Sequence, residues 1–490
     1  MLVQMPYQHA GLWVKKHSVA LIVGALILLL AAKFLYPVVR FGLPLGFDPG
    51  IYRYLFLRYA EAWPPFVLPE LRPWAQEYPY GLFIVSSYLL KLSIPVDWFL
   101  GWIWSAMAVL LISVFGMVMA QREDRTIGVL TLLMGLLSLA YYDGFAAMYW
   151  KTFFSLVFLV LTLSAFEKKS LWIVPLGAMT ILSHNQTGLI LALVLAAWWV
   201  LHLPTQWRNP SFRRLTILFV LIALLGLIWY APIWFRAFWA PLKSILLLRG
   251  EDAPGGVFPD AILYVRNGWV LLALGMGGFA WSFRRERFSV WQLSVLVCAV
   301  FVLFKLVFYR RFFLQLDFFL LPFAAMGLRD TWIYIAPRFL RVLLVALILW
   351  QGWLSVTWML RWEPGTSVEA LQSIQALPAA IESDAAVIAL ENQMAVRLLG
   401  WLPEHQTGGP GLFDYPPWTY DDWEQFLYGS HDERLDLLSA LQERPLYFMT
   451  SPLFYEYYGE YVKAFLADPC FEHVKNAPLL RVTCMPGEGE

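Results

Sequence analysis

The sequence is poor in charged residues, which make up 14% of its 490 residues. A soluble domain of average composition has about 25% charged residues, so this chain has too little polar surface for a globule that faces water. Hydrophobic residues make up 60% of it, and this excludes intrinsic disorder, which needs low hydrophobicity and high charge. The composition predicts a polytopic membrane protein.

Cysteine is also scarce, with three in the whole chain, and this excludes a disulfide-stapled scaffold. Lys and Arg (36) nearly balance Asp and Glu (35), so no excess of positive charge indicates a nucleic-acid partner. The sequence has no Walker A loop, no glycine-rich dinucleotide motif after a strand, no HExxH and no paired CxxC. Nucleotide hydrolysis and a tightly coordinated zinc ion therefore have no support.

Long apolar stretches dominate what is present. A helix needs about 20 mostly apolar residues to cross a membrane, and the many Trp and Tyr suit the two membrane interfaces. The first stretch ends without a small-residue cleavage site, so we interpret it as a retained helix. We predict eleven spans, near residues 18–39, 98–120, 126–142, 150–166, 170–184, 188–203, 215–236, 267–283, 289–308, 313–328 and 341–359.

The positive charges between these spans predict the orientation. Lys15 and Lys16 precede the first span, which favours a cytosolic N-terminus. The stretch 79–96 is ambiguous; if it is a juxtamembrane or re-entrant helix, most Lys and Arg of the later loops also fall on the cytosolic side. This topology, in the plasma membrane, places a long first loop (40–97) and the C-terminus outside the cytosol.

The composition changes at Glu363, where charged and turn-forming residues return. Short apolar runs such as 385–390 and 446–449 alternate there with helix-like stretches, a pattern typical of a small α/β domain. The predicted fold is therefore mainly α. It consists of a polytopic transmembrane helical bundle of about eleven spans over 1–362, followed by an extracytoplasmic α/β domain over 363–490.

Two of the three cysteines, Cys470 and Cys484, lie in this C-terminal region. Disulfides form and persist in oxidising compartments, so the two could pair if the region lies outside the cytosol. Two free thiols are equally compatible with the sequence.

Three acidic residues stand at the predicted outer ends of spans. Asp48 precedes Pro49, which is typical of a helix N-cap followed by Pro at the first helical position; it could only cap that helix, or it could deprotonate an acceptor group. Glu77 stands directly before Tyr78, where the chain turns back to the membrane. Asp143 lies in an Asp-Gly pair, which is also an ordinary turn signal.

Cations are found at the same predicted ends: Lys151, Lys305, Arg310 and Arg311. Ionisable residues at membrane depth are costly and suggest a function or a partner. Arg is suited to binding phosphate through two parallel hydrogen bonds, and Lys supplies a point charge. Snorkelling to lipid headgroups is the alternative, and we favour it for Lys305. Asp317 could pair with Arg310 or Arg311.

A polar run at 183–188 interrupts two apolar stretches. Hydrogen-bonding side chains do not stay in lipid without a partner. His184 could therefore bind a phosphate or orient a sugar, or it could only cap a helical turn. Asn185-Gln186-Thr187 fits the N-glycosylation pattern, but its tight position between spans makes it a weak acceptor site.

The layout of residues 15–360 resembles the GT-C superfamily of membrane glycosyltransferases. This superfamily includes the protein O-mannosyltransferases, the aminoarabinose transferase of lipid A and the oligosaccharyltransferases. Asp48 matches the acid that opens the first outer loop, Glu77 with Pro79 matches the acid and proline before the return helix, and Asp143 matches a further acid after the third span.

The late part of the chain extends this resemblance. Arg310-Arg311-Phe312-Phe313 is similar to an Arg-aromatic motif before a late span, and 363–490 corresponds to the outer C-terminal domain of several branches. Residues 408–414 with 418–423 resemble the tails of uncharacterised prokaryotic members. The first motif is a single Asp rather than an Asp-Glu or Asp-X-Asp pair, and the tryptophan-rich acceptor motif of oligosaccharyltransferases is absent. The resemblance thus implies no certain cofactor, while a divalent metal is possible.

The resemblance implies an inverting transfer of a sugar from a polyprenyl-phosphate donor to an extracytoplasmic glycan, lipid or protein acceptor. Asp48 would act as base, helped by Glu77 or Asp143, and the lipid tail would lie in an apolar groove between spans. Four side chains would offset the charge on the departing phosphate: Lys151, His184, Arg310 and Arg311.

Two other functions remain open. A polymerase or ligase of lipid-linked glycans would depend on Arg and His in a large outer loop between late spans, whereas the largest loop between spans here follows the first one. A transporter or a scaffold would not be an enzyme; transporters often show two related halves, and none is visible in this sequence.

Overall fold

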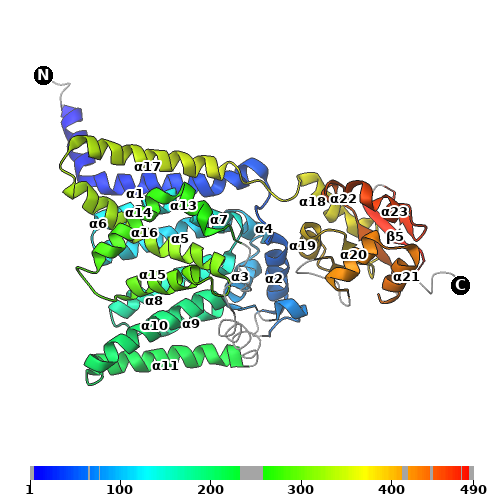
Figure 1. Ribbon diagram of the computed structural model, residues 1–490, viewed down its shortest axis with the longest axis horizontal. Helices are drawn as coiled ribbons and strands as arrows, with labels where there is room; N and C mark the ends of the chain where they lie inside the picture. Colours follow the sequence, from blue (N-terminus) through cyan, green and yellow to red (C-terminus); the bar gives the residue numbers. More distant parts are fainter. Residues whose placement is uncertain are drawn as a thin grey trace. The chain divides into compact units, whose positions relative to one another are not determined.

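The computed structural model describes residues 5–63, 67–76, 78–231, 258–410, 418–441, 445–475 and 477–484. The chain forms two compact units (Figure 1). The first comprises residues 1–36, 70–85 and 102–362, and the second comprises 37–69, 86–101 and 363–490. The second unit thus includes parts of the predicted first outer loop.

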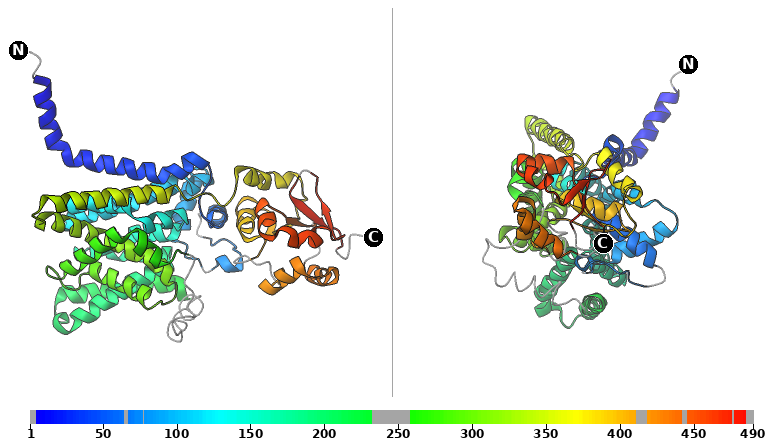
Figure 2. Two further views of the ribbon diagram at one scale, coloured as in Figure 1. Left: turned by 45° about the horizontal axis from the view of Figure 1, so that its top comes forward. Right: turned by 90° about the vertical axis from the view of Figure 1, so that its right-hand side faces the viewer.

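The first unit is helical. Two of its helices, α1 and α3, continue into the second unit. The helices that the described residues of this unit form are α1 (Met5–Phe41), α3 (Gly81–Lys91), α5 (Trp102–Arg122), α6 (Arg125–Leu137), α7 (Leu139–Ala146), α8 (Trp150–Glu167), α9 (Ile173–Ser183), α10 (Asn185–Gln206), α11 (Pro210–Tyr230), α13 (Ala261–Asn267), α14 (Trp269–Ser282), α15 (Val290–Leu303), α16 (Tyr309–Tyr334) and α17 (Arg338–Met359). A short 3₁₀ helix covers Pro73–Ala75. The left view in Figure 2 shows these helices packed as a bundle, with the first part of α1 projecting from it.

Seven of the described helices are long and apolar enough to cross a membrane, or up to nine if two bent pairs each count as one span. The bent pairs are α6 with α7, at 60°, and α13 with α14, at 96°. Each of the eleven predicted spans coincides with one of the seven, with a bent pair, or with the shorter apolar helices α9 and α15. The predicted multi-pass fold is confirmed, and the number eleven is reached only if α9 and α15 also cross.

Each bend has a local cause. Ser138 has an extended backbone between α6 and α7, and its hydroxyl accepts a hydrogen bond from the Tyr141 backbone N–H, which starts a new helix. Gly268 separates α13 from α14, and a Cβ there would lie 3.0 Å from the Tyr264 carbonyl oxygen. The apolar pattern continues through the break at Ser138, where the sequence predicts one span over 126–142, whereas the predicted span 267–283 begins at the second break and leaves α13 in the predicted loop.

Helices α14 and α16 pack with their backbones nearly in contact. A Cβ built on Gly278 would lie 1.9 Å from the Phe323 carbonyl oxygen, and one on Gly327 would lie 2.2 Å from the Leu274 carbonyl oxygen. Small residues at such interfaces let membrane helices approach closely and gain dispersion contacts. This interface fixes the position of α16, which begins with Arg310 and Arg311.

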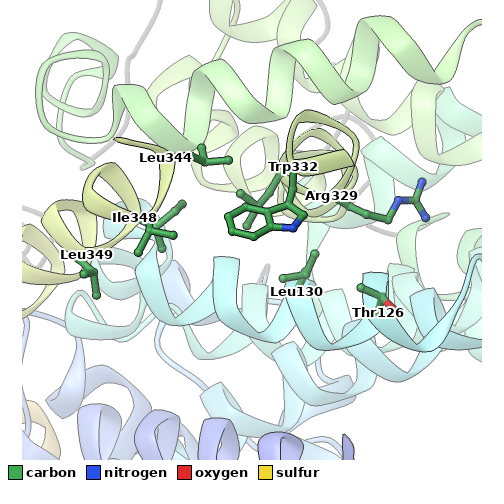
Figure 3. Close-up of a pocket in the computed structure, with 9 residues that line it drawn as sticks. Thr126, Leu130, Arg329, Trp332, Leu344, Ile348 and Leu349 are labelled. Atoms are coloured by element: carbon green, nitrogen blue, oxygen red, sulfur yellow. The ribbon is translucent and has the colours of Figure 1, made fainter. Parts of the chain in front are cut away.

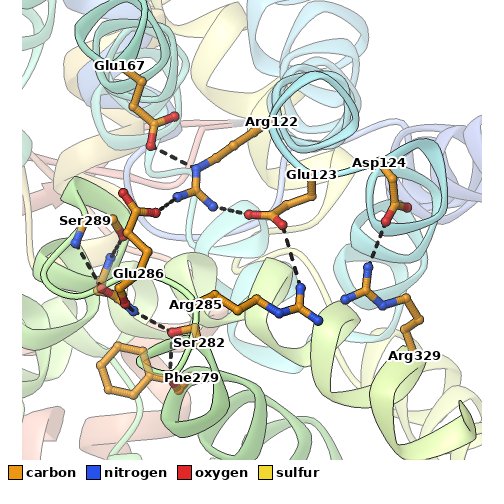
Figure 4. A network of polar contacts seen from close by, with 11 residues as sticks. Arg122, Glu123, Asp124, Glu167, Phe279, Ser282, Arg285, Glu286, Ser289 and Arg329 are labelled. Atoms are coloured by element: carbon orange, nitrogen blue, oxygen red, sulfur yellow. Dashed lines mark hydrogen bonds and ion pairs between the residues drawn. The ribbon is translucent and has the colours of Figure 1, made fainter.

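A network of charged side chains joins the loops at one end of this unit (Figure 4). Arg122 at the end of α5 pairs with three carboxylates from different places in the chain: Glu123, Glu167 and Glu286. Arg329 of α16 pairs with Asp124, which caps α6, at 2.7 Å. All these residues lie at span ends that the sequence predicts to be on one side of the membrane, so the described loops of that set do meet.

The second unit carries a mixed five-stranded sheet with strand order β2-β1-β3-β5-β4. β1 is parallel to both β2 and β3, whereas β5 is antiparallel to β3 and β4. The strands are β1 (Ala386–Ala389), β2 (Gln406–Gly408), β3 (Leu446–Met449), β4 (Phe471–His473) and β5 (Leu479–Val482). The predicted C-terminal α/β region is confirmed.

The helices of this unit come from both ends of the chain. They are α2 (Pro49–Ala62), α4 (Val96–Leu100), α18 (Val368–Ala376), α19 (Asn392–Trp401), α20 (Tyr420–Tyr428), α21 (His431–Ser439), α22 (Pro452–Tyr458) and α23 (Lys463–Leu466), with 3₁₀ turns at Leu377–Ala379 and Gly459–Val462. Phe426 and Phe448 are fully buried in the core over the sheet. Cys470 and Cys484, whose pairing the sequence leaves open, form a disulfide.

Helix α2 of the first loop packs directly on α19 of the C-terminal region. A Cβ on Gly50 would lie 1.8 Å from the Val396 carbonyl oxygen, and one on Gly400 would lie 2.6 Å from the Gly50 Cα. Arg53 also donates to the Gly400 carbonyl oxygen at 2.6 Å. These contacts fix the start of α2, and with it Asp48, to the C-terminal region.

Candidate functional site

Three of the predicted phosphate-binding residues lie close enough in the first unit for two of them to act electrostatically on the third. Lys151 lies in the first turn of α8, His184 lies between α9 and α10, and Arg311 lies in the first turn of α16. Both Lys151 and Arg311 act electrostatically on the His184 imidazole. Residues that are 160 positions apart at the extremes (151 and 311) therefore form one positively charged cluster.

Arg311 of this cluster and its neighbour Arg310 lie in the first turn of α16. Phe308 has a left-handed backbone (φ 55°) directly before the helix, which turns the chain sharply there. The Nε atoms of both Arg310 and Arg311 are buried and have no hydrogen-bond partner among the described residues. Arg310 lies 4.0 Å from an Asp260 carboxylate oxygen, and the Arg311 guanidinium lies 5.5 Å from the centre of the Tyr149 ring. The first turn of a helix also favours anions.

His184 serves as N-cap of α10. Its Nδ1 lies 2.9 Å from the Thr187 hydroxyl and accepts the Thr187 backbone N–H at 3.4 Å. Its Nε2 lies 3.5 Å from the Thr152 hydroxyl of α8. The capping interpretation is therefore correct for one ring nitrogen, and the other faces the helix that carries Lys151.

The rest of the polar run at 183–188 connects neighbouring helices. Gln186 donates to the Gln315 side chain at 3.3 Å, and the Tyr230 hydroxyl donates to the Asn185 side chain. The buried Ser183 hydroxyl has no hydrogen-bond partner among the described residues. Two of these polar side chains thus pair with α11 and α16, as expected for polar groups between apolar helices.

Lys151 contacts an aromatic residue of the returning first loop. Its ammonium nitrogen lies 3.2 Å from the centre of the Tyr78 ring, a distance typical of a cation–π interaction. The neighbouring acid Glu77 lies outside the described residues, and so do residues 411–417, which cover part of the segment that resembles prokaryotic tails. Glu77 stays a prediction.

Asp143 is not in a turn but inside α7, where it is 1% exposed. One carboxylate oxygen accepts from the Tyr264 hydroxyl at 2.6 Å. The other accepts from the indole N–H groups of Trp358 and Trp362, at 2.7 and 2.8 Å. The carboxylate thus links α7 to α13 and to the end of α17.

Lys33 is a second ionisable residue of this buried region, and the sequence analysis missed it. It lies in α1, is 8% exposed, and donates to the Leu136 carbonyl oxygen at 2.6 Å and to the Ser355 hydroxyl at 2.8 Å. The signal was available, because a lysine inside an apolar run is itself unusual. Asp317 also belongs here: it accepts from the Ser138 hydroxyl at 2.6 Å, whereas the pairing expected with Arg310 or Arg311 does not occur.

Asp48 belongs to the second unit and starts α2. It has the N-cap position, but its side chain makes no capping hydrogen bond. The half-buried carboxylate instead acts electrostatically on Arg397 of α19. Capping alone is therefore not the role of this side chain. Its meeting with the cations of the first unit stays a prediction.

An apolar cavity of about 380 Å³ lies between α6, α16 and α17 (Figure 3). Leu130, Trp332 and Ile348 contribute to its walls, and the one charged lining residue, Arg329, is already paired with Asp124. Arg329 follows Arg311 by 18 residues along α16, which corresponds to roughly 27 Å of helix. This cavity suits a lipid chain and not a phosphate group.

One described cluster has the spacing of a metal site. Ligand atoms of His431, Asp468 and Cys470 lie within 4.8 Å of one another. However, the Cys470 sulfur is bonded to Cys484, and Asp468 already pairs with Arg434 at 2.8 Å and with His431 at 3.0 Å. Thiolate ligation would require the free sulfur, so this cluster is better explained as a structural ion pair. A divalent metal elsewhere stays a prediction.

No protein-family model and no characterised protein sequence matches the chain. Solved structures do match. An archaeal oligosaccharyltransferase, AglB from Archaeoglobus fulgidus, in complex with an inhibitory peptide and a dolichol-phosphate, has a TM-score of 0.62 and 12% identity, covering 89% of this chain and 70% of that one.

ArnT from Cupriavidus metallidurans matches over nearly its whole length. The apo structure has a TM-score of 0.57 and 13% identity, covering 96% of this chain and 98% of that one. The structure bound to undecaprenyl phosphate has a TM-score of 0.54 and 13% identity, covering 95% and 97%. The likeness to both proteins thus extends over most of this chain, and the chain has the fold of the GT-C membrane glycosyltransferases.

Proposed function

We propose that the chain is an inverting membrane glycosyltransferase that moves a sugar from a polyprenyl-phosphate carrier to an extracytoplasmic glycan, lipid or protein acceptor. The observation that carries the proposal is the cluster of Lys151, His184 and Arg311 in one unit. The shared fold supports it, because the AglB structure contains a dolichol-phosphate and one ArnT structure contains undecaprenyl phosphate.

The cationic cluster would bind the donor phosphate. When the bond between the anomeric carbon and the phosphate oxygen breaks, negative charge develops on the departing phosphate. Arg310 and Arg311 have buried Nε–H groups without partners among the described residues, so they can donate to that oxygen. Lys151 and the first turn of α16 add positive potential, and such preorganised charge often contributes more to catalysis than any other effect.

The acceptor would be deprotonated by Asp48. Its carboxylate is half-buried, so it is partly accessible to an acceptor hydroxyl or amine from which it would take the proton. Glu77 would be a second base in the same loop. Asp143 is a weaker candidate, since its carboxylate already accepts three hydrogen bonds.

In the proposed orientation the charged network of Figure 4 faces the cytosol and the sheet lies outside it. Two observations support this orientation. The network gathers the most positive loops at one end of the bundle, as the positive-inside rule expects. The Cys470–Cys484 disulfide fits an oxidising compartment. The apolar cavity of Figure 3 would then hold a membrane-lipid chain near the cytosolic leaflet.

Release of polyprenyl phosphate from a polyprenyl-phosphate-linked sugar, in membranes supplied with glycan, lipid and protein acceptors to take the sugar, tests the proposal without knowledge of which acceptor reacts. Membranes containing the chain should release the carrier, and Arg311→Gln should lower the rate by at least tenfold, since it removes one donor to the leaving group. Asp48→Asn should lower sugar transfer while the protein inserts normally. Lys463→Gln, an exposed residue in the second unit, is the control.

Three outcomes would contradict the proposal. Carrier release at the level of empty membranes would exclude the transferase. Equal release by wild type and Arg311→Gln would exclude the cationic cluster as the phosphate site. Movement of the intact lipid-linked sugar across the bilayer, with no bond broken, would favour a transporter instead.

A further inference from the structure

The second unit contains a cavity of about 100 Å³ that the proposed transfer reaction does not use. Glu391, which follows β1, and Pro452 and Leu453, which follow β3, contribute to its walls. A single buried water needs only about 10–15 Å³ by a comparable measure. The cavity therefore has room for a small molecule or for a group on a larger one.

The sheet topology makes this a favourable place for a ligand. The chain leaves β1 through α19 to reach β2 on one side, whereas β3 pairs with β1 on its other side. The strand order thus reverses between β1 and β3, and the cavity lies beyond the carboxyl ends of these two parallel strands. Open α/β sheets bind their ligands in the crevice at such a switch point.

An unsatisfied arginine lines the cavity. Arg397 of α19 is 2% exposed, and its Nη2 donates to the Gly46 carbonyl oxygen at 2.9 Å. Its Nε and Nη1 have no hydrogen-bond partner among the described residues. The buried hydroxyl of Thr366, which also lines the cavity, likewise has no hydrogen-bond partner among the residues that the structure describes. Leaving buried donors unpaired costs free energy.

A second buried arginine of the same unit shows the contrast. The Nε of Arg434 donates to the Phe426 carbonyl oxygen at 2.9 Å, and its Nη1 pairs with Asp468 at 2.8 Å. Buried charges in proteins are normally paired and hydrogen-bonded in this way. Two nitrogens of Arg397 therefore lack the kind of partners that Arg434 has.

Neighbouring acids do not use these donors. Both carboxylate oxygens of Glu391 accept backbone N–H groups at the start of α19, from Gln393 and Met394, at 2.7 Å each. Burial lowers the pKa of Arg397 to about 10, against the opposing influence of Asp48 and Glu391. At neutral pH Arg397 therefore remains positively charged, and it lines the cavity.

We propose that this cavity binds a small oxyanion group, a carboxylate or a phosphate, through Arg397 and Thr366. The guanidinium supplies two N–H donors and a positive charge, and the hydroxyl supplies a third donor. The anion either stands alone or belongs to a larger molecule. This site is separate from the cationic cluster of the first unit and does not depend on sugar transfer.

Phosphorus NMR of inorganic phosphate added to the purified full chain in a phosphate-free detergent tests the site. Bound phosphate broadens the resonance, and we expect less broadening with Arg397→Gln than with wild type. Thr366→Val, which removes only the hydroxyl, should weaken binding roughly threefold to tenfold, as expected for one hydrogen bond. Lys463→Gln, a change of an exposed cation in the same unit, should match wild type.

The comparison of variants separates this site from the cluster of the first unit. Phosphate bound at Arg311 would broaden the resonance equally in wild type and in Arg397→Gln. Arg311→Gln would remove only this Arg311-dependent broadening. If acetate abolishes the Arg397-dependent broadening, the site also binds carboxylates. If the broadening persists in acetate, the site binds phosphate only.

Two results would overturn the proposal. One is equal broadening by wild type, Arg397→Gln and Thr366→Val, which would mean that the cavity binds no phosphate and holds only water. The other is loss of the Arg397-dependent part with glucose but not with acetate, which would identify a neutral hydroxyl ligand. If Arg397→Gln does not fold, the comparison of Thr366→Val with wild type decides alone.

Discussion

The close packing of α14 on α16 gives a sharp prediction from two adjacent glycines. A Cβ on Gly278 would lie 1.9 Å from the Phe323 carbonyl oxygen, whereas a Cβ on Gly277 would meet nothing within 4 Å. A backbone oxygen cannot rotate away, so Gly278→Ala must push the two helices apart by about 1.5 Å to restore an ordinary contact. That shift also weakens dispersion contacts along the interface.

The expected energies have opposite signs. Overpacking of this kind costs about 1–3 kcal/mol or more. Ala is favoured over Gly in a helix by roughly 1 kcal/mol, so Gly277→Ala should be neutral or stabilising. Both variants gain this helix preference, so they should differ by the overpacking cost of about 1–3 kcal/mol or more, although they insert the same methyl group one residue apart.

Thermal unfolding of both purified variants in detergent, followed by tryptophan fluorescence, measures this difference. Gly278→Ala should unfold well below wild type and Gly277→Ala at or above it. Because α16 begins with Arg310 and Arg311, Gly278→Ala should also slow release of the polyprenyl carrier. Equal unfolding midpoints for the two variants would refute the backbone contact.

Three further changes test other parts of the structure. Lys33→Met removes the donor to the Leu136 carbonyl oxygen and to the buried Ser355 hydroxyl, and should destabilise the bundle by about 1–3 kcal/mol for each group left unpaired; an unchanged unfolding midpoint would contradict this. Cys484→Ser opens a disulfide between residues 14 apart in sequence and should cost about 3 kcal/mol, which reduction of wild type should reproduce. Burial raises the pKa of Asp468, but hydrogen bonds from its neighbours, Arg434 among them, outweigh this and hold it below the ordinary value. Its stabilising contribution is thus complete above the unfolded-state pKa near 3.8 and is lost as the pH falls through the folded-state value; Arg434→Gln should shrink that acid-dependent loss in unfolding experiments at different pH.

The sequence predicts the membrane-crossing elements well because each is a long apolar run. It does not predict the break at Ser138, since the apolar pattern continues through it and the new helix starts with a local hydrogen bond to the Ser138 hydroxyl. Asp143-Gly144 resembles a turn in sequence, yet it lies inside α7 because its carboxylate is held by donors 121 to 219 residues away. Such long-range partners leave no local signal.

The residues of the candidate sites were likewise only partly predictable from the sequence. The cations Lys151 and Arg311 could be predicted, because charges at the ends of apolar runs are conspicuous. Arg397 could not, because an arginine in an amphipathic helix normally reaches solvent, whereas here its side chain is buried and donates to the Gly46 carbonyl oxygen of the first loop. Asp317 illustrates a local interpretation that fails: seven residues separate it from Arg310, but its partner Ser138 comes from another helix.

The hydrogen bonds of Asp143 allow its two possible roles to be separated by one conservative change. In Asp143→Asn, the remaining carbonyl oxygen can keep both indole donors, from Trp358 and Trp362. The new amide group would face the Tyr264 hydroxyl, which can rotate to accept instead of donate. The fold should therefore survive, whereas Asp143→Ala would leave three buried donors unpaired and lower the free energy of unfolding by about 1–3 kcal/mol for each donor.

If Asp143 only links α7 to its neighbours, Asp143→Asn should retain sugar transfer within a few-fold of wild type. A loss of transfer by orders of magnitude in a variant that unfolds at the wild-type temperature would instead make Asp143 a catalytic base.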